Sequence, residues 1–299
     1  MAAREPRVGV LGLGRMGLPI ARSLARAGFA VSVFDIAADR RTEASPLSAA
    51  DSAVDLARSV DTLVTVLPGA IEAERLLLDD GLIDEVGPGA LWLDLTSSDP
   101  TVSRRIAERA TQQGIASVAA PMGGGPSAAE SGRLRFFAGG EPSAIERATP
   151  ILAALGGEDA VDRVGNDIGD GGTAKLLANL LWFGQVVAVT EALLLGISLG
   201  VPIRSLRHSL GASPGGSVFV DEYLDSLLAG DYLETFGIDR VVEELDILVR
   251  LADRADVPFE LSRTVARLHR EALDRFGAID GELLAAKLLE ERAGIDLRS

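Results

Sequence analysis

Short apolar runs alternate with amphipathic segments through the first half of this chain. The runs near residues 7–11, 30–34, 62–66, 90–94 and 116–120 predict β-strands. Between them, segments such as "RMGLPIARSLARAG" and "PTVSRRIAERATQQG" space apolar residues as a helix does and end on glycine. Strands separated by helices imply parallel pairing with right-handed crossovers. The pattern therefore predicts a doubly wound α/β domain.

The periodicity changes in the second half. The α/β domain is expected to continue through "LRFFAGG" (134–140) and the helical "PSAIERATPILAALG", and to end near residue 165. After Gly172, the stretches 240–256, 260–277 and 280–294 place apolar residues three and four apart, which indicates helices. We predict an α/β domain over residues 1–165 and an all-helical domain over residues 166–299.

Residues 176–200 are apolar nearly all round and approach the length that crosses a bilayer. Asn179, Gln185 and Glu191 interrupt the run, and placing an acidic side chain in lipid costs about 2 to 3 kcal/mol. We therefore predict a buried core helix rather than a membrane span.

Composition narrows the function classes. The chain has 299 residues, 47% of them apolar, enough for two domains with a sizeable core. The net charge of −15 disfavours nucleic acid as a partner. The absence of cysteine excludes disulfides and thiolate metal sites, and two scattered histidines predict no metal centre. The N-terminus lacks the apolar stretch of a secretory signal, so a cytoplasmic protein is expected.

A glycine motif follows the first predicted strand. In "VGVLGLGRMG", Gly12, Gly14 and Gly17 have G-x-G-x-x-G spacing and lead directly into a helix. The first glycine permits a tight turn, the second lets a pyrophosphate approach the backbone, and the third lets helix and strand pack closely. The helix N-terminus offers unpaired N–H groups to the anion. The candidate cofactor loop is completed by Leu13, Arg15 and Met16. A strand-turn-helix without a ligand is the alternative.

Asp35 ends the second predicted strand, where a carboxylate can accept the hydroxyls of the adenosine ribose. A 2′-phosphate would meet its negative charge, so NAD is favoured as the cofactor. Arg40 and Arg41 follow closely and weaken that preference, which leaves NADP possible. The chain lacks a clear Ser-His-Asp arrangement and a G-K-[ST] phosphate loop, so hydride transfer is the remaining chemistry.

Lys175 is one of two lysines in the chain and stands in "GDGGTAKLLAN". We interpret Gly171 and Gly172 as a turn before a helix on which Lys175 and Asn179 share one face. Removal from water and a neighbouring positive nicotinamide both lower the pKa of a lysine amine, which could then accept a hydroxyl proton. Asn179 would orient the substrate oxygen. The structural alternative is a lysine that extends into solvent.

Together these segments resemble a known family. The N-terminal "GVLGLGRMGLPIARSLARAG", "TVLPG" (65–69), "LDLTSSDP" (93–100), "APMGGG" (120–125) and the K-x-x-x-N of "GDGGTAKLLAN" occur in order along the whole chain. They are similar to motifs of the β-hydroxyacid dehydrogenases, typified by 3-hydroxyisobutyrate dehydrogenase and tartronate semialdehyde reductase. The resemblance implies a Rossmann-type domain joined by a long helix to an all-helical domain.

The resemblance also implies roles for particular residues. Leu67 and Pro68 would border the cofactor, Thr96 and Ser97 would lie near the nicotinamide, and Lys175 would be the catalytic acid-base. The expected partner is a small-molecule substrate. The helical domain would mediate homodimers or homotetramers.

Two segments depart from the family pattern. The substrate loop has Gly123 where a serine is expected, although Gly123 and Gly124 could still present backbone N–H groups to an anion. The pattern F-x-x-x-x-x-x-K-D-L becomes "FGIDRVVEEL", which begins at Phe236 and places Glu243 at the lysine position. A reversed charge disfavours a dianionic acid and could suit a neutral or aminated substrate.

The sequence thus predicts an NAD(P)-dependent oxidoreductase that interconverts the alcohol of a small hydroxy acid and its carbonyl form. An imine reductase on the same fold is one alternative, favoured by Gly123 and Glu243 and disfavoured by Lys175. A non-catalytic NAD-binding subunit is another.

Overall fold

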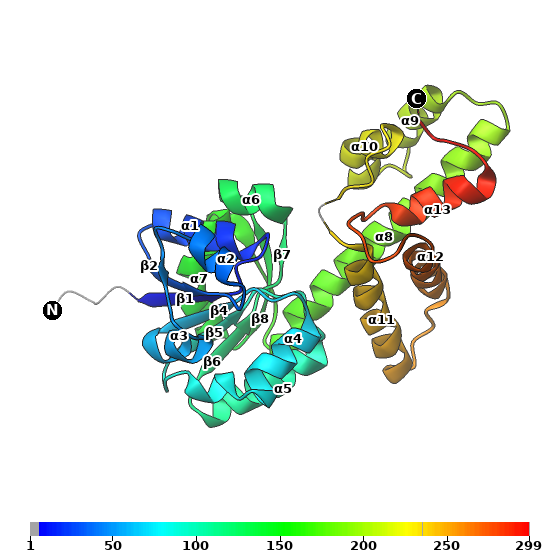
Figure 1. Ribbon diagram of the computed structural model, residues 1–299. Coiled ribbons are helices and arrows are strands. Elements are labelled where there is room, and N and C mark those ends of the chain that lie inside the picture. Colours follow the sequence, from blue (N-terminus) through cyan, green and yellow to red (C-terminus); the bar gives the residue numbers. More distant parts are fainter. Residues whose placement is uncertain (1–5, 235, 299) are drawn as a thin grey trace. The chain divides into compact units, whose positions relative to one another are not determined.

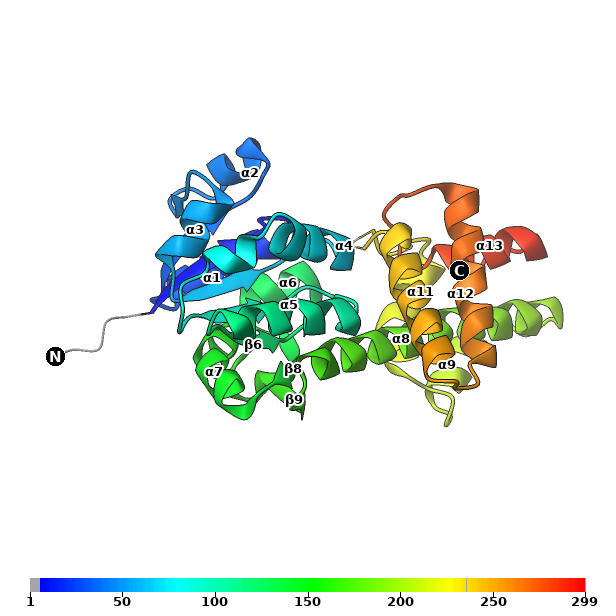
Figure 2. The ribbon, with the colours of Figure 1, turned by 90° about the horizontal axis from the view of Figure 1, so that it is seen from below.

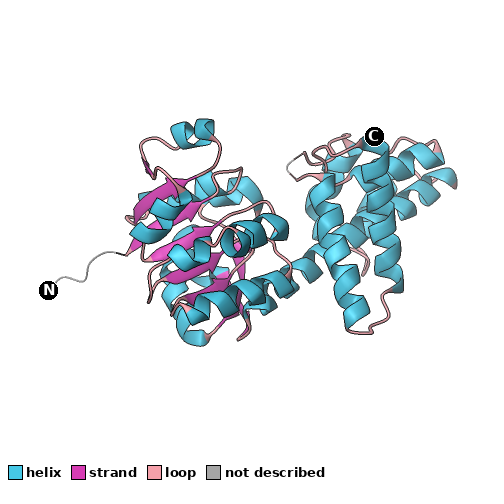
Figure 3. Cartoon of the chain, turned by 60° about the horizontal axis from the view of Figure 1, so that its bottom comes forward, coloured by secondary structure: helices cyan, strands magenta, loops and turns pink. Residues whose placement is uncertain are grey.

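A computed structural model describes residues 6–234 and 236–298 and divides into two compact units. The first unit is Met1–Lys175 and the second is Leu176–Ser299. All the strands lie in the first unit, and the second is built of helices (Figure 3). Residues 166–175, which the sequence assigns to the helical domain, group with the first unit.

The first unit is a twisted sheet with helices on both faces (Figure 1). The strand order is β3-β2-β1-β4-β5-β6-β8-β7, with β9 beside β8. The strands are β1 (Arg7–Leu11), β2 (Ala30–Phe34), β3 (Ser48–Ala49), β4 (Thr62–Thr65), β5 (Leu91–Asp94), β6 (Ala116–Ala119), β7 (Met122–Gly123), β8 (Arg135–Gly140) and β9 (Val161–Gly165). The helices are α1 (Gly17–Arg26), α2 (Ala38–Glu43), α3 (Ala53–Ser59), α4 (Ala70–Glu74), α5 (Pro100–Gln112), α6 (Gly125–Ser131) and α7 (Pro142–Gly156). The predicted doubly wound α/β fold is confirmed.

One part of the sheet departs from the predicted parallel pairing. Strands β3, β2, β1, β4, β5 and β6 are parallel, but β8 runs antiparallel to both β6 and β7. The connection from β6 to β8 contains only β7 and the short helix α6, and the chain returns from the edge at which β6 ended. A parallel return would need a longer crossover to the opposite edge.

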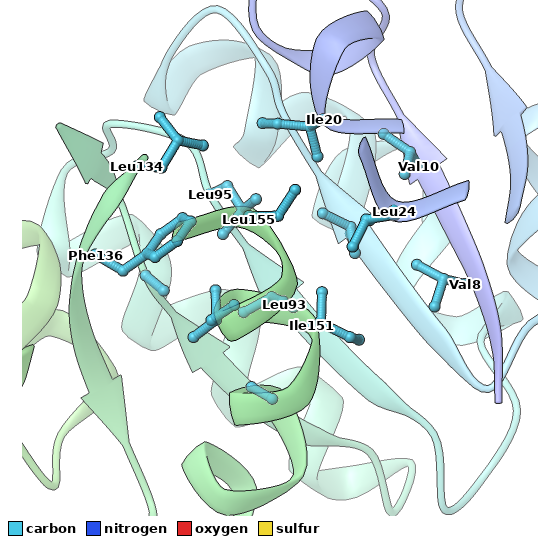
Figure 4. Packing of buried hydrophobic residues seen from close by; sticks show 14 of the residues in the cluster. Val8, Val10, Ile20, Leu24, Leu93, Leu95, Leu134, Phe136, Ile151 and Leu155 are labelled. Carbon is cyan, nitrogen blue, oxygen red and sulfur yellow. The ribbon is translucent and has the colours of Figure 1, made fainter. Parts of the chain in front are cut away.

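The hydrophobic core of this unit lies on both faces of the sheet. On one face, Val8 and Val10 of β1 meet Ile20 and Leu24 of α1, and Phe136 of β8 contributes to the same cluster (Figure 4). Helix α7 lies along β6, β8 and β9 on this side (Figure 2). On the other face, α3, α4 and α5 cover a second cluster centred on Trp92. The site is thereby built on a sheet buried on both sides.

Helix α8 (Ile168–Ser198) crosses the boundary between the units. Gly171 and Gly172 lie inside this helix, so the prediction that they form a turn before it is wrong. A Cβ on Gly171 would stand 2.3 Å from the carbonyl oxygen of Phe137 and 2.8 Å from that of Ala119. Gly171 is needed because the helix backbone passes directly against the sheet at this position, which helix propensity alone does not reveal.

The second unit packs its helices around the remainder of α8. Its other helices are α9 (Ile203–Gly211), α10 (Leu224–Leu228), α11 (Ile238–Arg254), α12 (Glu260–Phe276) and α13 (Leu284–Ala293), with a π-helical segment at Phe219–Tyr223. Within this unit, residues 176–187 of α8 pack with α11, α12 and α13. Residues 186–194 pack with the segment 219–228 and α13. The three amphipathic helices predicted over residues 240–294 are present: α11 is shifted two residues towards the N-terminus, α12 ends one residue earlier than predicted, and α13 is shorter at both ends.

The sequence predicts a buried core helix here, but part of the apolar surface of α8 is exposed. Leu177, Leu181 and Leu195 on α8, and Leu199 just beyond its end, are between 44% and 74% exposed. By length and composition α8 is also the one helix among the described residues that could cross a membrane, a test that core helices of soluble proteins also pass. The sequence shows the apolar residues but does not show which face the neighbouring helices leave uncovered.

Candidate active site

The glycine motif occupies the turn between β1 and α1, at the carboxyl ends of the strands. Gly12 has φ +94°, and a Cβ there would stand 2.2 Å from the carbonyl oxygen of Val66. A Cβ on Gly17 would stand 1.8 Å from the carbonyl oxygen of Gly12. Both glycines are therefore required by the protein's own backbone, because any side chain would displace the turn.

Gly14 differs from its two neighbours in the motif. Among residues 6–234 and 236–298, and apart from its chain neighbours, the one atom within 4 Å of a Cβ built on it is Nη1 of Arg40, the end of a flexible side chain, at 3.2 Å. The backbone at Gly14 is thus open on one side, with a guanidinium above it and the first turn of α1 beside it. This arrangement fits an anion such as a pyrophosphate. Around it, Leu13 is buried in the core, Arg15 is exposed and Met16 is half-buried.

Asp35 follows β2 and is buried against the glycine loop. Its Oδ2 accepts a hydrogen bond from the N–H of Leu13 at 2.7 Å, and its Oδ1 accepts one from the N–H of Ala37 at 2.9 Å. Arg40 Nη1 lies 3.8 Å from the same Oδ2. Each carboxylate oxygen can accept a second hydrogen bond, so the carboxylate remains suited to a ribose diol.

The loops after β4 and β5 are joined by hydrogen bonds. The N–H of Leu67 donates to Oγ1 of Thr96 at 3.1 Å, and the N–H of Thr96 donates to Oδ1 of Asp94 at 3.1 Å. Thr96 is buried, whereas Pro68 is exposed and Ser97 is half-buried. The structure therefore brings together the two loops that the resemblance assigned to the cofactor.

Asp94 is a site residue that the sequence analysis missed. It ends β5, is 1% exposed, and also accepts a hydrogen bond from Thr65 Oγ1 at 2.8 Å. Burial raises the pKa of its carboxyl to about 6, against the hydrogen bonds from Thr96 and Thr65, which lower it. A carboxylate at the end of the otherwise apolar run "LWLD" was the available signal.

The glycines after β6 form the start of a short helix rather than a regular loop. Gly123 ends β7, and Gly124, with φ +118°, precedes α6. Nothing lies within 4 Å of a Cβ built on Gly123, so a serine would fit there without displacing its neighbours. The absence of a serine is therefore not imposed by local packing.

Lys175 lies one turn beyond the glycines that pack on the sheet. Residues three and four apart share a helix face, so Lys175 is on the face of Gly171 and Gly172. A Cβ on Gly172 would stand 3.3 Å from the carbonyl oxygen of Ser98, in the loop after β5. The start of α8 is further fixed by Asp167, whose Oδ1 accepts from the N–H of Gly169 at 2.8 Å and from Arg104 Nε at 2.7 Å. Lys175 therefore shares a helix face with residues that approach the end of β6 and the loop after β5.

In the second unit, Asn179 and α11 are directly connected. The amide of Asn179 donates a 2.6 Å hydrogen bond to Oε2 of the buried Glu244. Glu243 instead forms a 2.8 Å ion pair with Arg240, one turn earlier on α11. Phe236 is half-buried against the cluster around Phe183. The charge of Glu243 is thus offset within its own helix, which the sequence pattern did not indicate.

Two family models match the chain. Residues 7–165 match the NAD-binding domain of 6-phosphogluconate dehydrogenase, and residues 169–289 match the NAD-binding domain of NADP-dependent 3-hydroxyisobutyrate dehydrogenase.

Similar proteins are dehydrogenases of hydroxy acids. An NAD-dependent L-serine dehydrogenase of Pseudomonas aeruginosa is 34% identical over 73% of this chain and 73% of its own length. Human mitochondrial 3-hydroxyisobutyrate dehydrogenase is 30% identical over 90% of this chain and 82% of its own length.

Solved structures share the fold. A 3-hydroxyisobutyrate dehydrogenase of Mycobacterium tuberculosis with L-serine has a TM-score of 0.86 at 23% identity, over 95% of this chain and 99% of that one. An imine reductase variant of Myxococcus stipitatus in complex with NAD+ has a TM-score of 0.65 at 20% identity, over 95% of this chain and 99% of that one.

Proposed function

The chain belongs to the 3-hydroxyisobutyrate dehydrogenase family of β-hydroxyacid dehydrogenases, and we propose from this premise that Lys175 is its acid-base in the oxidation of a small β-hydroxy acid. The protein is an NAD(P)-dependent oxidoreductase. The observation that supports the lysine most is the close approach of Gly171 to the sheet and of Gly172 to the loop after β5, because Lys175 shares a helix face with these glycines.

The residues of the first unit fit a dinucleotide. The open backbone at Gly14 would hold the pyrophosphate, Asp35 would hold the adenosine ribose, and the loops of Leu67 and Thr96 would border the nicotinamide. A nicotinamide cofactor supplies the hydride acceptor for alcohol oxidation and the hydride donor for the reverse reaction.

In this proposal Lys175 acts as the general base in the oxidation and as the general acid in the reverse reaction. Its neutral amine accepts the proton of the substrate hydroxyl through Nζ, and the resulting ammonium returns the proton to the carbonyl oxygen in the reverse direction. Asn179 lies one turn further on the same helix face and would orient the substrate oxygen. The bond from Asn179 to Glu244 supports this role, because it fixes the amide in one orientation.

We propose NAD as the preferred cofactor, with NADP also accepted. Asp35 retains capacity for the ribose hydroxyls, which favours NAD. Arg40 is half-exposed and lies between Asp35 and the backbone at Gly14, where its guanidinium could contact a 2′-phosphate. The two side chains therefore act in opposite directions on the same position of the cofactor.

The proposed substrate class is a small β-hydroxy acid such as L-serine or 3-hydroxyisobutyrate. Both names come from the relatives, and a compact hydroxy acid is common to them. Arg240 pairs with both Glu243 and Asp239, so this part of α11 keeps a net negative charge, which disfavours a dianionic acid and supports a zwitterionic or at most monoanionic substrate.

A substrate panel with two lysine variants tests this function. We expect Lys175→Met to lower kcat by about 10²- to 10⁴-fold on the preferred hydroxy acid, as loss of a general base does. Lys287→Met is the matched control, because the Lys287 amine lies 5.2 Å and 5.0 Å from the ring centroids of Tyr232 and Phe276 and has a structural role. Equal activity of wild type and Lys175→Met would refute the catalytic lysine.

The same panel separates the alternative functions. Imine reductases share this fold at 20% identity, which supports the architecture and not the activity. Turnover of cyclic imines alone would replace the hydroxy acid assignment. Cofactor binding without turnover of any hydroxy acid, aldehyde or imine would instead favour a non-catalytic subunit.

We also propose that the second unit pairs with a second copy of the chain through α8. The exposed Leu177, Leu181, Ala188, Leu195 and Leu199 lie on one helix face with spacings of 4, 7, 7 and 4 residues. This order is symmetric about Ala188. An antiparallel copy with its twofold axis at Ala188 would therefore place Leu181 opposite Leu195 and Leu177 opposite Leu199. Both helices could cover their exposed faces along about 33 Å.

A further inference from the structure

A set of hydrogen bonds joins the two loops assigned to the nicotinamide. Asp94 Oδ1 accepts from Thr65 Oγ1 at 2.8 Å and from the N–H of Thr96 at 3.1 Å. Thr96 Oγ1 in turn accepts from the N–H of Leu67 at 3.1 Å. Asp94 thus connects the end of β4, the end of β5 and both following loops.

Burial of the Asp94 carboxylate is energetically unfavourable. Asp94 is 1% exposed, and its Oδ2 has no hydrogen-bond partner among residues 6–234 and 236–298. A buried charge without a cationic partner costs stability, so packing of the sheet does not account for this residue. Trp92 on the same strand shows that the region can bury a large side chain and satisfy its polar atom, because Nε1 donates to Thr65 Oγ1 at 3.0 Å.

An ionised carboxylate can only accept hydrogen bonds, and Asp94 accepts from one strand and one loop. The N–H of Thr96 donates to Asp94, and the hydroxyl oxygen of Thr96 accepts from the N–H of Leu67. Replacement of Asp94 by an apolar residue would leave the N–H of Thr96 and the hydroxyl of Thr65 without this acceptor. The connection between the end of β4 and the loop after β5 through this carboxylate would then be lost.

We propose that Asp94 is a positioning residue that holds the loops of Leu67 and Thr96 in place at the nicotinamide half of the cofactor. The inference rests on the proposed function, because it takes the cofactor to lie at these loops. Asp94 acts through Thr96 and does not itself touch the cofactor.

The inference predicts a selective effect on one half of the dinucleotide. The adenosine side is built by Asp35 with the N–H groups of Leu13 and Ala37, and these bonds share no residue with the Asp94 set. NADH contains both halves, whereas ADP-ribose contains the adenosine and pyrophosphate groups without the nicotinamide. A substitution that disrupts Asp94 should therefore weaken the binding of NADH and leave the binding of ADP-ribose unchanged.

The test measures dissociation constants of NADH and ADP-ribose by calorimetry for the full-length wild type and Asp94→Leu. We expect the Kd of NADH to rise about tenfold or more, and the Kd of ADP-ribose to stay within about twofold. Asp94→Asn is the rescue control, because its Oδ1 can still accept from Thr65 and Thr96, and it should bind NADH within about threefold of wild type. Thr65→Val removes one bond to Asp94, together with the acceptor of Trp92 Nε1, at a residue outside both loops, and should give a smaller loss of the same kind.

Three results would overturn the inference. One is NADH binding by Asp94→Leu that equals wild type. Another is an equal loss of affinity for NADH and ADP-ribose in a variant with a native circular dichroism spectrum, which would indicate general damage to the sheet. If Asp94→Leu fails to fold, Thr65→Val takes its place, and unchanged NADH affinity in Thr65→Val would overturn it. Failure of the proposed function is distinguishable, since wild type would then bind neither ligand.

Discussion

Asn179 and Glu244, 65 residues apart in sequence, are joined by a 2.6 Å hydrogen bond from the amide of one to the carboxylate of the other. The bond links α8 to α11 in the second unit. Glu244 is 5% exposed, so its carboxylate is held inside the protein with the amide as a hydrogen-bond donor. An amide bound to a carboxylate must present its nitrogen to it, which determines the direction of its carbonyl oxygen.

This relationship predicts different results for two substitutions at residue 244. Glu244→Gln retains an oxygen that accepts from Asn179, so we expect kcat within about threefold of wild type. Glu244→Leu leaves the amide of Asn179 without that acceptor, and we expect kcat/KM to fall about tenfold and stability by about 1 to 3 kcal/mol. Steady-state kinetics and urea unfolding check both values. Equal activity of the two variants would contradict an orienting role.

The first two turns of α8 predict a steric effect. In Gly171→Ala the new methyl group would stand 2.3 Å from the carbonyl oxygen of Phe137, so the helix must shift away from the sheet. We expect a loss of about 1 to 3 kcal/mol in stability, together with reduced kcat because Lys175 moves with the helix. Thermal unfolding and kinetics measure the two effects.

Gly184→Ala on the same helix is the control for this steric effect. The nearest atom to a Cβ on Gly184 is 4.0 Å away. Alanine is favoured over glycine inside a helix by about 1 kcal/mol, so this variant should be more stable than wild type. A similar loss in both variants would show that packing on the sheet is not the cause.

The sequence predicted the elements whose signal is local. Strands β1, β2, β4, β5 and β6 and helices α11, α12 and α13 follow from apolar periodicity, because each buries one face or one run. The glycine motif was found because three glycines have a fixed spacing before a helix. The family resemblance located the two loops of Leu67 and Thr96.

What the sequence could not predict depends on contacts between distant segments. Asp94 gains its role from Thr65 on the neighbouring strand, and Gly171 is required by the backbone of β6 and β8. The pairing of Glu243 with Arg240 could have been predicted from the sequence, since the two residues are three apart on one helix. The bond between Asn179 and Glu244 was not, because it requires the packing of two helices.

Arg40 predicts a change in cofactor preference. Its guanidinium lies 3.8 Å from Asp35, near the position expected for a 2′-phosphate. In Arg40→Ala we expect the Kd of NADPH to rise about tenfold, which corresponds to one charged contact, and the Kd of NADH to change by less than about threefold. Fluorescence titration with each cofactor measures both. Arg22→Ala is a suitable control, because that guanidinium donates to the carbonyl oxygen of Glu43.

The exposed face of α8 predicts the oligomeric state. Leu195→Arg places a charge opposite Leu181 of a symmetric copy. By light scattering at micromolar concentration, we expect the mass of a dimer for wild type and the mass of a monomer for this variant. Leu261→Arg is matched in exposure and lies on α12, outside this face, and should leave the mass unchanged. A monomeric wild type would contradict the pairing, and binding of wild type to lipid vesicles would indicate a membrane as the occupant.

The buried His269 predicts the response of stability to acid. Its side chain is 0% exposed, its Nδ1 lies 2.9 Å from the carbonyl oxygen of Val265, and its ring centroid lies 5.4 Å from that of Phe183. Burial lowers its pKa from 6.5 to about 4, although the hydrogen bond with Val265 acts in the opposite direction. Between these values the unfolded chain binds a proton that the folded protein does not.

The free energy of unfolding must therefore fall as the pH decreases from 6.5 towards 4, by about 3 kcal/mol for this residue alone. Asp94 acts with the opposite sign, because its raised pKa makes the folded protein bind the proton first as the pH falls through about 6. His269→Phe removes only the first contribution, so its advantage over wild type should grow between pH 7.5 and pH 4.5 in urea unfolding. A constant difference between the two proteins at both pH values would show that His269 has the same pKa in the folded and the unfolded protein.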